Sequence, residues 1–153
     1  MPVINVVLAL YMILYFVLAS QAVFYKLCFS SVFQRIPAQQ FINIRKLADP
    51  LLETRLPVFY YSCLAFGILF IILSFLQGTI FTQVLAALSF VFLIIDVILA
   101  RKYNIPINLQ IRTVVNPAEV LAVRLQNEWL KWIDTRGNFI LAGFLMLIIY
   151  TCL

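Results

Sequence analysis

The chain has 153 residues, of which 65% are hydrophobic and only 11% charged, and its formal net charge is +5. Soluble domains have roughly 45–50% apolar and about 25% charged residues, so this composition excludes an ordinary soluble protein and indicates an integral membrane protein. The basic charge is expected to set membrane topology, and nucleic-acid binding is excluded because no basic face is free of lipid-seeking residues. The chain has no histidine, the commonest general base and metal ligand.

The first predicted element is a transmembrane helix over residues 3–25. This almost wholly apolar run is about 22 residues long, which is enough to cross a bilayer. No Lys or Arg precedes it, and the run is longer than the apolar part of a signal peptide, so we expect a retained helix rather than a signal peptide. The helix should continue past Lys26 and stop before Pro37, because a residue that precedes proline disfavours helical angles.

A polar connection over residues 26–56 follows. Phe41, Ile44 and Leu47 recur at the spacing of one helix face, which favours a short helix lying along the membrane interface. Asp49-Pro50 has the pattern of a cap and a first helical residue. The interfacial segment and the next span are therefore predicted to be separate helices.

Two further spans are predicted over residues 57–77 and 80–100. Only Gln77-Gly-Thr79 stands at their junction, so the two helices are expected to form a tight antiparallel hairpin. Residues 101–116 form a second polar connection.

The last predicted element is one long helix from Pro117 to about Tyr150. Asn116 suits the N-cap, Pro117 the first helical position and Glu119 the end of a capping pattern. At 1.5 Å per residue this helix is roughly 50 Å long, against ~30 Å for the hydrocarbon core. We expect its first half to protrude and residues 133–153 to span.

These segments predict an all-α, single-domain integral membrane protein. Its architecture is an antiparallel bundle of four transmembrane helices, with an interfacial segment after the first helix and a long, protruding fourth helix. All 11 Lys and Arg residues lie in the 26–56 and 101–137 connections. Because cytoplasmic loops are rich in Lys and Arg, both connections are expected on the cytoplasmic side of the cell membrane and both termini on the opposite side.

Asp96 and Arg136 are expected to meet near the cytoplasmic edge of the hydrocarbon. Counted from Gly78, Asp96 lies roughly 27 Å along the third helix; counted from Leu153, Arg136 lies roughly 25 Å along the fourth. Because an unpaired charge at that depth is costly, Asp96 is expected to pair with Arg136 or with Arg101. The pair has two open interpretations, a structural lock between helices and part of a functional site.

Other polar residues share this predicted level and suggest a pocket open to the cytoplasm. The candidate ligand-binding residues are Asp96, Asn104, Asn108, Trp132, Arg136 and Asn138. Trp129 and Trp132 would form the rim, although an interfacial aromatic belt is the favoured interpretation of both. Asp96 and Asp134 are the candidates for a catalytic base. Metal-ligand spacings, phosphate loops and nucleophile elbows are absent from the sequence, so neither a metal nor a cofactor is expected.

Three short stretches carry a family pattern: Phe33-Gln-Arg-Ile-Pro37 followed by Phe41, Asn104-Ile-Pro-Ile-Asn108, and Trp129-Leu-Lys-Trp132 followed by Arg136. Together they resemble the small four-span membrane proteins that include the fungal anthrone oxygenases. The resemblance covers most of the chain. It implies a four-helix membrane fold and, for the oxygenase members, chemistry without metal or flavin. Relatives commonly carry a histidine near the position of Asp134.

Three functions stay open at this point. The first is a non-enzymatic membrane protein whose cytoplasm-facing polar pocket binds a small amphipathic or hydrophobic molecule. The second is a cofactor-free, anthrone-oxygenase-like enzyme on aromatic substrates, with Asp96 or Asp134 as base. The third is a subunit of a larger membrane complex. The expected partners are membrane lipid, a small hydrophobic ligand, and a second copy of the chain or a membrane-complex partner.

Overall fold

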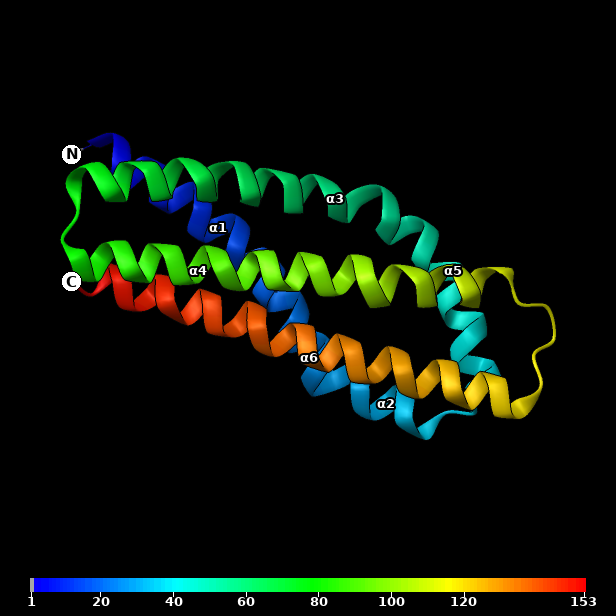
Figure 1. The fold of residues 1–153 in the computed structure, drawn as a ribbon. Coiled ribbons are helices and arrows are strands. Elements are labelled where there is room, and N and C mark those ends of the chain that lie inside the picture. Colours follow the sequence, from blue (N-terminus) through cyan, green and yellow to red (C-terminus); the bar gives the residue numbers. More distant parts are fainter. Residues whose placement is uncertain (1) are drawn as a thin grey trace.

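The computed structural model describes residues 2–153, which are helical over nearly their whole length and include no strand. Four helical rods are long and apolar enough to cross a membrane: Val3–Arg35, Ala38–Gln77, Ile80–Thr113 and Glu119–Thr151. This confirms the all-α class and the four candidate spans. Figure 1 shows both termini at one end of the molecule, together with the turn that joins the second and third rods. The connection between the third and fourth rods lies at the opposite end.

The first rod consists of α1 (Pro2–Phe24), a π-helical turn η1 (Tyr25–Phe29) and α2 (Ser30–Arg35). The helical path continues past Lys26, as predicted. Ile36 is extended, with φ −83° and ψ 152°, and it directly precedes Pro37. The predicted stop before this proline is therefore confirmed.

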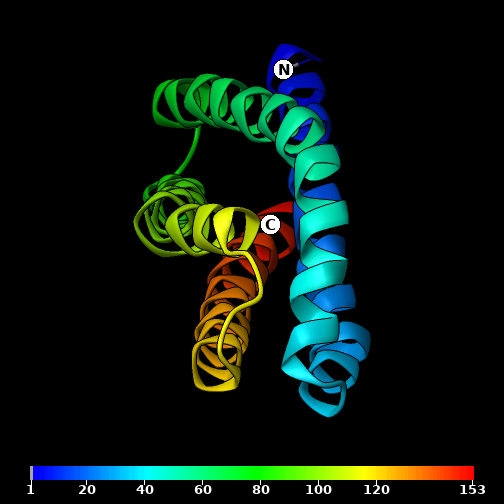
Figure 2. The same ribbon diagram turned by 90° about the vertical axis from the view of Figure 1, so that its right-hand side faces the viewer.

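The second rod, α3 (Ala38–Gln77), is one continuous helix of 40 residues. The predicted new helix start at Asp49-Pro50 is therefore wrong. Pro50 and Pro57 both lie inside the helix, where each removes a backbone hydrogen bond and favours a bend. Figures 1 and 2 show the result: the first half of α3 (cyan) runs across the charged end of the molecule, and the second half (green) runs along the other rods.

The third rod consists of α4 (Ile80–Leu99), a second π-helical turn η2 (Ala100–Asn104) and α5 (Ile105–Thr113). The span predicted to end at residue 100 therefore continues as helix to Thr113. Pro106 does not break it, because it occupies the first turn of α5, where its missing N–H matters least. The short connection to α3 is confirmed, since only Gly78 and Thr79 separate α3 from α4.

The fourth rod is the single helix α6 (Glu119–Thr151), which confirms the long last helix. Its predicted cap is wrong: Ala118 occupies the cap position and makes no side-chain cap hydrogen bond. Asn116 instead adopts a left-handed conformation with φ 47° in the preceding turn. Asn tolerates this conformation because its short polar side chain can hydrogen-bond locally.

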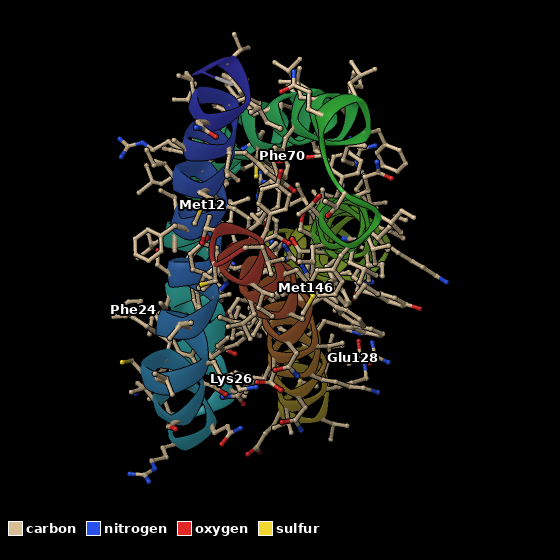
Figure 3. The ribbon with its side chains drawn as sticks, turned by 90° about the vertical axis from the view of Figure 1, so that its left-hand side faces the viewer. Met12, Phe24, Lys26, Phe70, Glu128 and Met146 are labelled. Carbon is tan, nitrogen blue, oxygen red and sulfur yellow. The ribbon has the colours of Figure 1, made fainter. Side chains whose placement is uncertain are left out.

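The buried apolar side chains form two separate cores. The span core lies among the apolar halves of the rods and consists of Val7, Tyr11, Tyr15, Leu18, Ala19, Cys63, Phe70, Ala86, Leu93, Ile140 and Leu147. The end core lies at the charged end and consists of Phe33, Ala38, Phe41, Ile42, Ile107, Ile111, Ala122, Leu125, Trp129 and Leu130. Figure 3 shows Phe70 pointing into the span core, whereas Phe24 points outward.

Large apolar side chains also cover the outside of the apolar halves. Ile13 and Phe16 on α1 are 60% and 55% exposed, and Ile72 and Phe75 on α3 are 51% and 56% exposed. Soluble monomers rarely expose apolar surface on this scale. The exposed faces suit contact with lipid acyl chains, as expected of a multi-pass membrane protein.

Replacement of Gly143 by alanine should loosen the contact of α1 with α6. A Cβ at this position would lie 1.8 Å from the Tyr15 hydroxyl oxygen, and Tyr15 is fully buried. That hydroxyl donates to the Ser89 carbonyl at 3.1 Å, so its displacement also breaks a buried hydrogen bond. Gly143→Ala is expected to destabilise the protein by about 1–3 kcal/mol, measured by thermal unfolding in one detergent.

Gly137→Ala on the same helix is the matched control. Its added Cβ would lie 3.6 Å from the Ala22 Cβ, which is an ordinary contact. Because alanine is the better helix former, this variant should be unchanged or more stable by up to about 1 kcal/mol. Equal unfolding temperatures for the two variants would contradict the close packing at Gly143.

Candidate functional site

Asp96 and Arg136 form a bidentate ion pair between α4 and α6. Arg136 donates from Nε to Asp96 Oδ1 at 2.8 Å and from Nη2 to Asp96 Oδ2 at 3.3 Å. The predicted pairing of Asp96 with Arg136 is confirmed. Arg101, the alternative partner, does not pair with Asp96.

Two further side chains complete this group, which we call the inner cluster: Tyr60, Asp96, Asn104 and Arg136. The Tyr60 hydroxyl on α3 donates to Asp96 Oδ2 at 2.7 Å and accepts from Arg136 Nη2 at 3.0 Å. Arg136 Nη1 donates to Asn104 Oδ1 at 3.2 Å. The inner cluster thus joins the second, third and fourth rods.

Burial makes these contacts necessary. The Asp96 side chain is 2% exposed and that of Arg136 is 14% exposed. Charges removed from water are tolerated only when the opposite charge and further hydrogen bonds compensate for the lost hydration. The inner cluster supplies both, because each Asp96 oxygen accepts at least one hydrogen bond.

A second group, the outer cluster, consists of the buried Arg45, Asp49 and Trp129 and the half-buried Asn108. Arg45 and Asp49 form an ion pair one turn apart on the first half of α3, with side chains 4% and 3% exposed. The Arg45 guanidinium carbon lies 4.3 Å from the centroid of the Trp129 ring, within cation–π range. The Trp129 indole N–H donates to Asn108 Oδ1 at 3.0 Å.

Sequence analysis missed Arg45 and Asp49 and misplaced Trp129. Arg45 was counted only for topology and Asp49 was assigned to a helix cap, although the Arg–Asp spacing of four residues beside Phe41 and Ile42 was a usable signal. Trp129 is 2% exposed, belongs to the end core and lines the cavity. The favoured assignment to an interfacial belt is therefore wrong, and the alternative, a place at the pocket, agrees with the structure.

Both clusters line one cavity of about 260 Å³. Its walls come from all four rods, and most of the wall is apolar, including Leu18, Ala22, Leu52, Leu56, Ile133 and Ile140. Leu18 and Ile140 belong to the span core, whereas Trp129 belongs to the end core. The cavity therefore lies at the junction of the two cores.

The mouth of the cavity opens between α3 and the third rod. Tyr61 on α3 is 60% exposed, and Ile105 and Leu109 on α5 are 47% and 48% exposed. An ion pair across the same gap joins Arg112 on α5 to Glu53 on α3, and both residues line the cavity. The mouth is thus lined by exposed apolar side chains and by this ion pair.

Four buried polar atoms of cavity-lining residues have no hydrogen-bond partner among the described residues: Arg45 Nε, Asp49 Oδ1, Asp49 Oδ2 and Asn104 Nδ2. Of these, Asp49 Oδ1 is held in the ion pair with Arg45. The Asn104 amide is oriented by Arg136, which donates to its oxygen, so its NH₂ group is left free for another partner. A buried polar group without a partner costs about 1–3 kcal/mol.

No protein-family model, curated protein or solved structure matches the chain. The resemblance to the four-span family that includes the anthrone oxygenases therefore stays a prediction. Within residues 2–153, no three side chains of the metal-ligating types gather closely enough to hold a metal ion.

The structure brings four of the predicted ligand-binding residues to the cavity: Asp96, Asn104, Asn108 and Arg136.

The other predicted site residues make different contacts. Trp132 stacks on Tyr103, with 3.5 Å between ring centroids. Asn138 accepts a hydrogen bond from Lys26 on η1, and Asp134 pairs with the same ammonium at 3.3 Å. Figure 3 shows Lys26 reaching from the first rod toward α6. Trp132, Asp134 and Asn138 therefore lie outside the cavity lining, and Asp134 is 45% exposed.

Removal of one charge from the inner cluster should destabilise the protein more than removal of both charges. Asp96→Leu leaves Arg136 buried without its counter-charge, and we expect a destabilisation of about 3–5 kcal/mol. Asp96→Leu combined with Arg136→Met should recover much of this loss, since no buried charge remains. Thermal unfolding of the two single variants and the double variant measures the coupling; additive effects would contradict a coupled pair.

Proposed function

We propose that this chain is a multi-pass membrane protein that binds a small amphipathic molecule in the cavity between its two polar clusters. The observation that carries the proposal is the cavity itself, whose walls are largely apolar and include a few polar side chains of the two clusters. Ligand sites generally combine an apolar lining with a small number of placed polar groups. An apolar cavity of ~150 Å³ already admits benzene.

The proposed placement in the membrane is an antiparallel four-helix bundle with the charged end on the cytoplasmic side. The rods have 33, 40, 34 and 33 residues, whereas roughly 20 suffice to cross the hydrocarbon. The excess length stands at the charged end, which carries the Lys and Arg residues. Outward-facing Ile44, Leu47 and Leu51 on the first half of α3 suit the predicted interfacial position.

In this placement the cavity lies at the level of the lipid headgroups, and its mouth faces sideways. The exposed apolar lip of Tyr61, Ile105 and Leu109 supports entry of the ligand from the bilayer. A small hydrophobic or amphipathic molecule is already concentrated there by its own transfer free energy.

The anthrone-oxygenase-like alternative has one observation in its favour. The Tyr60 hydroxyl stands on the cavity wall between a carboxylate and a guanidinium, where it can exchange a proton with a bound aromatic substrate. Asp134 supports it less, because its carboxylate lies outside the cavity lining. Turnover of an anthrone that persists in Asp134→Asn and is lost in Tyr60→Phe would favour this alternative over binding alone.

A role as a subunit of a larger membrane complex is the remaining alternative. It would use the exposed apolar faces, including Phe16 and Phe75, for contact with another chain. Co-purification of a stoichiometric partner, lost when these side chains are replaced by alanine, would favour it.

A cavity-filling variant tests the binding proposal. Ala100 lines the cavity, and Ala100→Phe should occupy much of the ligand's volume. Ala65→Phe, on an exposed part of α3 outside the cavity lining, is the matched control. Native mass spectrometry of protein extracted from membranes should show a small-molecule adduct on the wild type and on Ala65→Phe, but not on Ala100→Phe. The same adduct on all three proteins would refute binding in this cavity.

Cysteine labelling tests the proposed orientation. In a background with Cys28, Cys63 and Cys152 replaced by alanine, Gln77→Cys should react with a membrane-impermeant maleimide in intact cells. Val115→Cys, at a position 81% exposed in the opposite connection, should react only after permeabilisation. The reverse pattern would place the charged end outside.

A further inference from the structure

We infer that the ligand of this cavity is a single-chain amphiphile with one negative charge, such as a fatty acid, whose headgroup oxyanion pairs with Arg101 at the mouth. The inference rests on the proposed binding function and adds the chemical class of the ligand. Three observations carry it: the balance of charges on the lining, the position of Arg101, and the volume and apolar lining of the cavity.

The charged residues of the lining leave one base without an acid. Their ion pairs are Arg45 with Asp49, Arg112 with Glu53 and Arg136 with Asp96. Arg101 is the remaining charged residue of the lining, and it forms no ion pair with any residue from 2 to 153. With three acids and four bases, the lining carries one excess positive charge. A ligand with one negative charge balances it.

Arg101 lies at the mouth of the cavity. Arg101, Ile105 and Leu109 follow one another at intervals of four residues along η2 and α5, so they share one side of the third rod. All three residues line the cavity and are exposed. Because water reaches Arg101, its charge needs no buried partner, and its guanidinium is free to form the paired hydrogen bonds that carboxylates and phosphates accept.

The volume and lining of the cavity suit one apolar chain. The lining includes Leu18, Leu64, Val97, Ile133 and Ile140. A cavity of ~150 Å³ holds the six carbons of benzene, so the volume of about 260 Å³ suits a single chain of roughly ten carbons. An anionic headgroup is costly to bury, so it stays with Arg101 at the mouth while the chain enters.

Two brominated probes with the same chain separate headgroup recognition from chain binding: 11-bromoundecanoate and 11-bromoundecan-1-ol. Bromine quenches tryptophan fluorescence on contact. In Trp132→Phe the only tryptophan is Trp129, which lines the cavity and is 2% exposed, so quenching reports a chain inside the cavity. Titrations in phosphatidylcholine nanodiscs at about pH 9 keep the carboxylate ionised and Arg and Lys protonated. Ala100→Phe, which fills the cavity, should abolish quenching by both probes.

Arg101→Gln in this background is expected to weaken binding of 11-bromoundecanoate roughly tenfold, because it removes a charge-assisted contact. Its affinity for the alcohol should stay within about twofold. Lys102→Gln is the matched control, since it removes the same charge from the neighbouring exposed residue, which lies outside the cavity lining. This control should leave the binding of both probes unchanged. Arg101→Lys keeps the charge and should retain most of the affinity for the carboxylate.

The contrary outcomes are separable. Equal losses of carboxylate affinity in Arg101→Gln and Lys102→Gln would reduce the effect to diffuse surface charge, which overturns the inference and leaves the binding function standing. Equal losses for the two probes in Arg101→Gln would also overturn headgroup recognition. Quenching by neither probe would overturn the binding function as well. If Arg101→Gln does not fold, Arg101→Met repeats the comparison.

Competition distinguishes two sources of the oxyanion. Undecanoate carries a carboxylate, and a lysophosphatidylglycerol carries a phosphodiester with the same single charge on one chain. Displacement of 11-bromoundecanoate by undecanoate alone would support a fatty acid, and displacement by the lysolipid as well would extend the site to phosphodiester headgroups. Displacement by neither would contradict a shared site at Arg101.

Discussion

The buried ion pair of Asp96 with Arg136 is the constraint on which the arrangement of the helices depends. Neither charge can remain at that depth without the other, and the bidentate geometry allows only one height and one rotation of α6 against α4. Tyr60 and Asn104 extend the same restriction to α3 and to η2. Apolar packing alone would be less selective, because lipid tails are as apolar as the side chains that face them.

Rod length explains why a cavity forms next to this pair. Each rod is longer than the hydrocarbon of a bilayer is thick, and the rods pack around two cores, one among their apolar halves and one at the charged end. The bend of α3 around Pro50 and Pro57 carries its first half across the end core and its second half along the span core. The two cores therefore do not merge, and polar side chains from both sides line the space between them.

Much of the fold could be predicted because membrane spans are long apolar runs. The depth of a residue, counted along its helix from the uncharged end, predicted the Asp96–Arg136 pair, because the two residues come out at nearly the same level. It failed for Trp132 and Asn138, where the side of the helix matters as well as the depth. The ion pair of Arg45 with Asp49 was missed because a charged residue in a polar connection is ordinarily solvated, and only the fold of α3 onto α6 buries it.

The sequence by itself determined the helical class, the four candidate spans and the level at which the buried acid and base meet. These follow from local rules, since backbone groups in lipid must be satisfied within a helix and buried charges must be paired. Only the tertiary structure decided that α3 is continuous through two prolines, that η2 and α5 extend the third rod, and that a second polar cluster lines the same cavity. Those features depend on contacts between residues far apart in the chain, and no local pattern encodes which face of a helix its neighbours will cover.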